Sequence, residues 1–210
     1  MDKGFGIGKL FGIRIRVDWS WLFLFLLTTW NLSNAFGQFH DDWGSVMRWG
    51  MGVVAALLFF ASALLHELAH SLVASARGIP VCSITLFLFG GVSNIQREPH
   101  SPGVEFWMAI VGPLTSLTLG GALVVLASLS AGPLQAMVSS PGQIIAALGP
   151  LAMLLAWLGS INFTLGLFNL IPGFPLDGGR ILRSFLWAVT DDLKRATRWA
   201  SWAGQGIAWL

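Results

Sequence analysis

The sequence predicts an all-α polytopic membrane protein with a small membrane-associated β-hairpin. Of its 210 residues 55% are hydrophobic and only 10% are charged, whereas soluble domains carry about 25% charged residues. Several apolar stretches approach the length of about 20 residues that spans a bilayer. One of them contains His66, Glu67 and His70, and ionisable side chains in such a stretch are costly and therefore point to function. Residues 1–210 are expected to form a single transmembrane core.

Composition excludes several classes of protein. The net charge of +2 is too small to indicate nucleic-acid binding, and the single cysteine, Cys82, allows neither an intrachain disulfide nor a cysteine-based metal site. The first 17 residues mix lysines and arginines with glycines, and no small-residue cleavage site follows. We therefore expect the first apolar segment to be a retained anchor, and the lipid bilayer to be a partner of the chain.

About five to six hydrophobic segments are expected. The clearest cover residues 17–32, 46–76, 105–130 and 143–170, and a further one runs from Ala200 to Leu210. This last segment is too short to span a bilayer, so the chain is expected to stop inside a helix. The catalytic part is expected in segments 46–76, 105–130 and 143–190.

Lysine and arginine placement predicts the orientation in the membrane. Basic residues occur in the amino-terminal arm and after the second and fourth segments. This placement predicts that these parts lie on the cytoplasmic side of the bilayer. The cell membrane is the expected location of the chain. His66 precedes Arg77 by 11 residues, so a rise of about 1.5 Å per residue puts it about 15 Å from that face. The active-site side is thus expected to be cytoplasmic.

Residues 79–96 predict a β-hairpin. Val81–Phe89 and Val92–Ile95 are rich in β-branched and aromatic residues, and Gly90-Gly91 separates them. A free strand edge beside a membrane can accept another extended chain. A re-entrant packing loop without a role in substrate binding is the alternative interpretation.

The H-E-x-x-H array His66–His70 predicts a metal site. Residues i and i+4 share one helix face, so both imidazoles can bind one ion while Glu67 stands beside them. A catalytic zinc site takes a third protein ligand. Asp177 is the best candidate, because Pro172 and Pro175 break the helix just before it and such irregular backbone at membrane depth faces protein or water.

Three other residues are weaker candidates for the third ligand. His40 is interpreted as a solvated residue of the outer loop, and His100 as a cytoplasmic loop residue. Glu105 opens the third segment, where a carboxylate interacts favourably with the helix dipole, so a capping role is expected.

Three stretches together resemble the site-2 protease family of intramembrane zinc metalloproteases. They are His66–His70, Glu105–Ser116 (EFWMAIVGPLTS) and Asn169–Arg180 (NLIPGFPLDGGR), and the resemblance covers about residues 50–190. It implies one Zn²⁺ per chain bound by His66, His70 and Asp177, with Glu67 as the base. It also implies that Asn169 lies near the substrate carbonyl, and that the hairpin engages an unwound transmembrane substrate.

The resemblance implies hydrolysis of peptide bonds within or near transmembrane segments. The main alternative is a catalytically silent membrane protein that binds transmembrane substrates or partners, and the intact Glu67 argues against it. A metal transporter would need ligands staged along several helices, whereas this chain shows one compact cluster. Asn169 has its own alternative role, as a cap of the broken helix.

Overall fold

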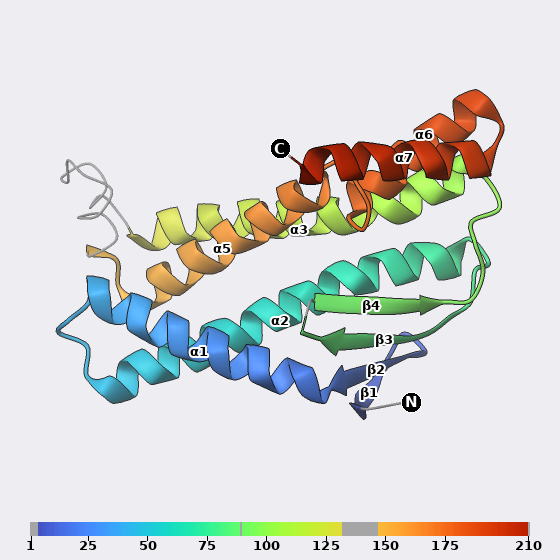
Figure 1. Cartoon of the computed structure of the whole chain (residues 1–210). Helices are drawn as coiled ribbons and strands as arrows, with labels where there is room; N and C mark the ends of the chain where they lie inside the picture. Colours follow the sequence, from blue (N-terminus) through green and yellow to red (C-terminus); the bar gives the residue numbers. More distant parts are fainter. Residues whose placement is uncertain (1–3, 89, 132–146, 210) are drawn as a thin grey trace.

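The structure is a computed structural model that describes residues 4–88, 90–131 and 147–209. Long helices pack along one another, and a β-sheet lies beside one end of the helical layer (Figure 1). In chain order the elements are β1 (Gly4–Leu10), β2 (Ile13–Asp18), α1 (Trp19–Phe39), α2 (Ser45–Ala76), β3 (Val81–Phe87), β4 (Gly90–Ile95), α3 (Pro102–Ala131), α5 (Pro150–Asn169), α6 (Asp177–Thr190) and α7 (Leu193–Ala208).

Among the described residues, three helices are long and apolar enough to cross a membrane, namely α2, α3 and α5. Each of them exposes large apolar side chains such as Leu58, Val125 and Leu167, as a helix in contact with lipid does. The predicted segments 46–76 and 105–130 agree closely with α2 and α3. The fourth begins at Pro150 rather than 143, and residues 143–146 lie outside the described part.

The expected count of five to six hydrophobic segments is not confirmed. α1 begins at Trp19 and continues to Phe39, but it is not among the three candidate spans. The segment expected from Ala200 belongs to α7, which begins at Leu193 and has its last helical residue at Ala208. Both α6 and α7 are amphipathic rather than uniformly apolar. Basic and small polar residues alternate with their apolar residues at helical spacing.

The β-structure is larger than the predicted hairpin. β3 and β4 confirm the hairpin itself, but they belong to a four-stranded sheet of order β1-β2-β3-β4 within the described chain. β2 pairs with β3 in parallel, while the outer pairs are antiparallel. The prediction of an all-α protein with one hairpin was therefore wrong for the amino-terminal arm, which supplies half of the sheet.

The amino-terminal strands carry a signal in the sequence. Ile13, Ile15 and Val17 are buried, while Arg14 and Arg16 point to the other face, which is the period of two typical of a half-buried strand. Phe11 and Gly12 have φ angles of 51° and 83°, as a two-residue hairpin turn requires.

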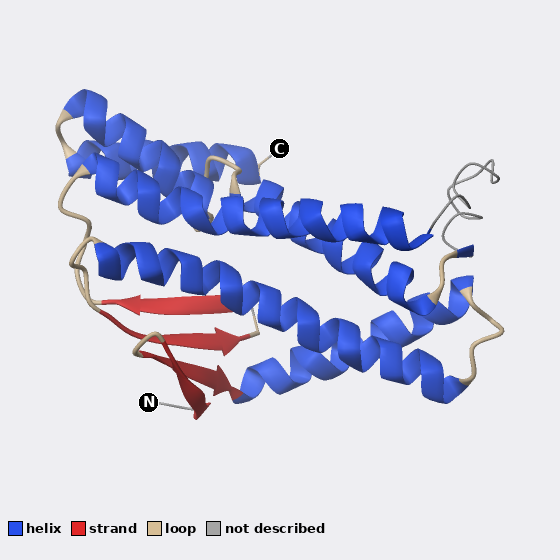
Figure 2. Cartoon of the chain, turned by 180° about the vertical axis from the view of Figure 1, so that it is seen from behind, coloured by secondary structure: helices blue, strands red, loops and turns tan. Residues whose placement is uncertain are grey.

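The sheet packs against the half of α2 that carries His66 and His70. Ile13, Ile15 and Ile84 form a buried cluster with Leu68 of α2. On its other side α2 contacts α3 and α5, so it separates the sheet from the layer of the later helices (Figure 2). Side chains from the middle of α2 are therefore enclosed on both sides.

Close packing joins α3 to α5. A Cβ added at Gly120 would lie 2.7 Å from the backbone nitrogen of Phe163 and 2.9 Å from the carbonyl oxygen of Gly159. A Cβ added at Gly159 would lie 3.0 Å from the carbonyl oxygen of Gly120. Gly120 is thus a point of close contact between the two helices, whereas Gly121 meets no described atom of another element within 4 Å of its Cβ position.

Candidate active site

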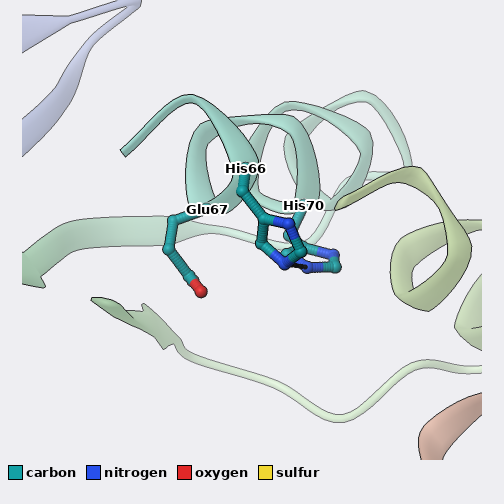
Figure 3. Close-up of side chains that lie close together, drawn as sticks. All are labelled: His66, Glu67 and His70. Carbon is teal, nitrogen blue, oxygen red and sulfur yellow. Dashed lines mark hydrogen bonds between the residues drawn. The ribbon is translucent and has the colours of Figure 1, made fainter. Parts of the chain in front are cut away.

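His66 and His70 lie one turn apart on α2 and project to the same side of the helix (Figure 3). Only 5% and 4% of their surfaces are exposed. Their Nε2 atoms are 3.1 Å apart, which follows from the i, i+4 spacing on a regular helix.

Asp177 joins the two histidines from the start of α6. Its Oδ2 lies 3.1 Å from the Nε2 of His66 and 3.1 Å from the Nε2 of His70. The chain between α5 and α6 folds back on the first turn of α6, because a Cβ at Gly178 or Gly179 would collide with the backbone of residues 170–174. The two glycines therefore allow the close approach that aims Asp177 at α2.

The three ligand-type atoms fit a zinc ion. Ligand atoms about 2.0 Å from the ion in a tetrahedral site lie about 3.3 Å from one another, and the three separations here are all 3.1 Å. The Nδ1 of His70 donates to the carbonyl oxygen of Met108 over 2.5 Å. Because a carbonyl only accepts, the neutral ring keeps its lone pair on Nε2, where a cation can use it.

The ring of His66 is also oriented by a contact from α3, the helix that contains Met108. Its Nδ1 lies 2.9 Å from the Oγ of Ser116 in α3. Such contacts to the second ring nitrogen fix the orientation of metal-binding histidines. The backbone and one side chain of α3 thus hold both imidazoles with their Nε2 atoms facing Asp177.

Glu67 lies beside the two histidines, and a carboxylate oxygen of Glu67 is within 4.8 Å of their ring nitrogens. Its Oε2 accepts a hydrogen bond of 2.9 Å from Ser93 of β4. Gly91 of the same strand passes so close that an added Cβ would collide with the Glu67 side chain. The sheet therefore contacts Glu67 directly.

A cavity of about 320 Å³ opens onto this group. It is lined by Ala63, His66, Glu67, Phe87, Gly90, Gly91, Val92, Leu165, Asn169, Pro175, Leu176 and Asp177. Asn169, the last residue of α5, faces it, and its Nδ2 donates to the carbonyl of Leu165 over 2.9 Å. The structure thus brings four of the five predicted site residues, His66, Glu67, Asn169 and Asp177, to one cavity, and the fifth, His70, contacts His66 and Asp177 from outside its lining.

The weaker ligand candidates lie in other surroundings. His40 follows α1 and stacks on Trp43 with ring centroids 4.0 Å apart, and it is only 5% exposed. The expectation of a solvated loop histidine was therefore wrong, because the aromatic contact buries the ring. His100 is exposed in the connection before α3, as predicted.

Glu105 stands in the first turn of α3, as expected. It is fully buried and forms an ion pair with Arg183 of α6. The guanidinium of Arg183 also lies over the ring of Phe174, 5.6 Å from its centroid. A buried carboxylate needs a cationic partner, and here that partner comes from a helix distant in sequence.

Sequence reasoning missed four residues that surround the site. Ser93 contacts Glu67, whereas Met108, Gly112 and Ser116 all lie on the face of α3 that meets the histidines. The spacing of Gly112 and Ser116, four residues apart, gave a usable signal, because small residues on one face of a span favour close contact.

The chain is similar to proteins named zinc metalloproteases. It is 41% identical over 210 residues to the putative zinc metalloprotease sll0528 of Synechocystis, and 39% identical over 208 residues to the putative zinc metalloprotease Rip3 of Mycobacterium tuberculosis. The matches cover 100% and 99% of this chain but 51% and 50% of these relatives. The chain therefore spans about half the length of the curated relatives it matches.

A solved structure shares the fold. The site-2 protease from Methanocaldococcus jannaschii matches with a TM-score of 0.63 and 31% sequence identity, over 98% of this chain and 81% of that one. The family model of Peptidase family M50 matches residues 54–210, which include α2 from Val54 onward, the sheet strands β3 and β4, and all later described helices. On these grounds the chain belongs to Peptidase family M50, the site-2 protease family.

Proposed function

We propose that this chain is an intramembrane zinc metalloprotease that hydrolyses peptide bonds within or near transmembrane segments of membrane-protein substrates. The observation that carries the proposal is the convergence of His66 Nε2, His70 Nε2 and Asp177 Oδ2 at equal separations of 3.1 Å beside Glu67. These three residues would hold one Zn²⁺ per chain, and residues 1–210 would form a single catalytic core. When bound, the ion supplies Lewis-acid chemistry.

Glu67 is the base in this proposal. Its carboxylate takes a proton from the attacking water and passes it to the leaving nitrogen of the cleaved peptide bond. Asn169 stabilises the developing negative charge on the substrate carbonyl oxygen. One N–H of its amide is bonded to Leu165, and the second N–H is available to the substrate.

The substrate enters as an extended chain paired with β4. Among the described strands β4 is the edge of the sheet beyond β3, so its outer backbone groups can pair with another strand. Gly90, Gly91 and Val92 of β4 line the cavity on one side, and Leu165 and Asn169 of α5 line it on the other. A substrate strand between them would present its carbonyl groups to His66, Glu67 and Asp177.

The same proposal includes a topology. The chain is a multi-pass protein of the cell membrane, with its amino terminus and the active-site side in the cytoplasm. Arg14 and Arg16 line a cleft on the outer face of the sheet, while Arg97, Arg180 and Arg183 line another at the neighbouring ends of β4 and α6. This concentration of arginines supports a cytoplasmic position for that end.

Metal content and cleavage, measured together, test the function. The purified chain in detergent should contain about one zinc ion and cut a single-span substrate, and a chelator should stop the cutting. Glu67→Gln should keep the metal and abolish cleavage, whereas His66→Ala should lose both. Zinc without Glu67-dependent cleavage would favour the silent binding protein. Zinc content that His66→Ala leaves unchanged would refute the metal site.

A further inference from the structure

We propose that Ser93 is a positioning residue for hydrolysis, which holds the Glu67 carboxylate in place and is itself held by Ser71. The strand that pairs with the substrate would then also orient the base. This inference rests on the proposed function and extends it to a residue outside the H-E-x-x-H array.

The contacts form a chain of three side chains. The Oγ of Ser93 donates to Glu67 Oε2 over 2.9 Å, and the Oγ of Ser71 lies 3.0 Å from the Oγ of Ser93. An ionised carboxylate only accepts hydrogen bonds, so Ser71 donates to Ser93 and Ser93 donates to Glu67. Ser71 is fully buried in α2, which gives this chain a rigid end.

The similar spacing of residues along α2 and β4 explains why Ser93 contacts Glu67 and Ser71. Four residues of a helix rise about 6.0 Å, and two residues of a strand rise about 6.6 Å. Gly91 and Ser93 therefore run beside Glu67 and Ser71 in step. The alternation on the strand agrees, since Gly91 and Ser93 are partly buried and the intervening Val92 is exposed.

A slip of one residue along the strand would destroy the arrangement. It would turn Val92 towards Glu67 and send Ser93 to the outer face of the sheet. Ile95, the next inward residue, packs against a buried cluster that includes Ala74 of α2. The register is thus fixed by apolar packing at one end and by the lack of a side chain at Gly91 at the other.

The consequence for catalysis is orientation. The terminal torsion of a glutamate is broad, so an unrestrained carboxylate would sample many positions. Because Ser93 holds Oε2, Oε1 remains for the attacking water. Loss of this hydrogen bond should reduce the rate of the chemical step more than it reduces substrate binding or metal binding.

The experiment compares Ser93→Ala, Ser93→Thr and Ser71→Ala in the full chain. Zinc content, kcat and KM are measured for a single-span substrate in detergent. Hydrogen bonds to charged groups are worth enough that Ser93→Ala should lower kcat by about 10-fold to 100-fold, with KM and zinc content unchanged. Ser93→Thr keeps the hydroxyl and should retain most of the activity, and Ser71→Ala should have a smaller effect.

Ser83→Ala is the matched control, because Ser83 lies on the neighbouring strand β3, where it pairs with Arg14 of β2. In the wild type and in each variant, the infrared spectrum minus that of the same protein with Glu67→Gln added isolates the carboxylate band of Glu67. This band should shift in Ser93→Ala and stay in place in Ser83→Ala.

Three results would overturn the proposal in distinguishable ways. If the wild type cleaves and Ser93→Ala retains its kcat and its carboxylate band, only the role of Ser93 fails. If Ser93→Ala loses zinc or changes KM alone, Ser93 is a structural or binding residue. A wild type that binds zinc and never cleaves removes the proposed function together with the positioning role.

Discussion

At the scale of single residues, the space beside the histidines depends on Gly112. An added Cβ at this position would lie 2.7 Å from His66 Nε2 and still closer to His70 Nε2. The helix α3 can therefore approach α2 closely enough for Met108 and Ser116 to bond both rings only because residue 112 has no side chain. Glycine is required at position 112 for lack of space and not for an unusual backbone conformation, since the residue lies within a regular helix.

Gly112→Ala should consequently weaken zinc binding. The new methyl group would push the imidazoles away from Asp177, and disturbances of groups that orient metal ligands typically cost about 10-fold to 100-fold in affinity. Gly121→Ala is the control, because it makes the same change in the same helix where no described atom of another element lies within 4 Å. Competition with a zinc chelator measures both variants, and equal affinities would contradict the steric account.

At the scale of elements, α6 is held to α3 by the ion pair of Glu105 and Arg183. Only one end of the pair is partly accessible, with 15% of the Arg183 side chain exposed and none of Glu105. Since α6 begins at Asp177, this contact also fixes the helix that presents the Asp177 carboxylate to the histidines. The pair thus connects the first turn of α3 to the candidate metal site.

Removal of one partner should be worse than removal of both. Arg183→Met would leave a buried carboxylate without a cation, which typically costs about 3–5 kcal/mol. The double variant Glu105→Leu/Arg183→Met should recover much of the loss, because apolar pairs replace buried ion pairs well. Thermal unfolding in detergent tests this, and a double variant less stable than Arg183→Met would argue against it.

The last helix supports the loop that precedes Asp177. A Cβ at Gly204 of α7 would lie 2.9 Å from the backbone nitrogen of Phe174, whereas Gly206 has open space. Gly204→Val should therefore displace the loop and lower zinc content, and Gly206→Val should not. The two variants carry the same change of helix propensity, so similar zinc contents in both would exclude a supporting role for α7.

At the scale of the whole molecule, apolar surface and arginines occupy different regions. Large apolar side chains are exposed along α2, α3 and α5. Arginines line the clefts beside the sheet and the start of α6. This separation suits a protein with one end at the cytoplasmic surface of a membrane.

Cys82 offers a direct test of this topology. It is the single cysteine of the chain, it is partly exposed, and it lines the same outer cleft as Arg14. A membrane-impermeant maleimide should label it from the cytoplasmic side only. Asp41→Cys in a Cys82→Ser background lies in the exposed connection between α1 and α2, and it should be labelled from the opposite side. Reversed labelling would invert the proposed orientation.

Much of the helical layer could be predicted, because long apolar runs have a strong signal. The bounds of α2 and α3 differ from the prediction by only a few residues. The amino-terminal strands were missed, although β2 alternates buried and outward residues, because both strands are short and glycines interrupt β1. The parallel pairing of β2 with β3 joins segments that α1 and α2 separate in sequence, and no local pattern reveals such pairing.

By itself, the sequence determined which ionisable side chains lie within apolar helices, since hydropathy and the i, i+4 spacing are local properties. The ligand role of His66, His70 and Asp177 stays a prediction, as do the roles of Glu67 and Asn169. Only the tertiary structure decided what surrounds them, namely Met108 and Ser116 behind the histidines and Ser93 beside Glu67. These contacts join residues far apart in the chain, and packing alone chooses such partners.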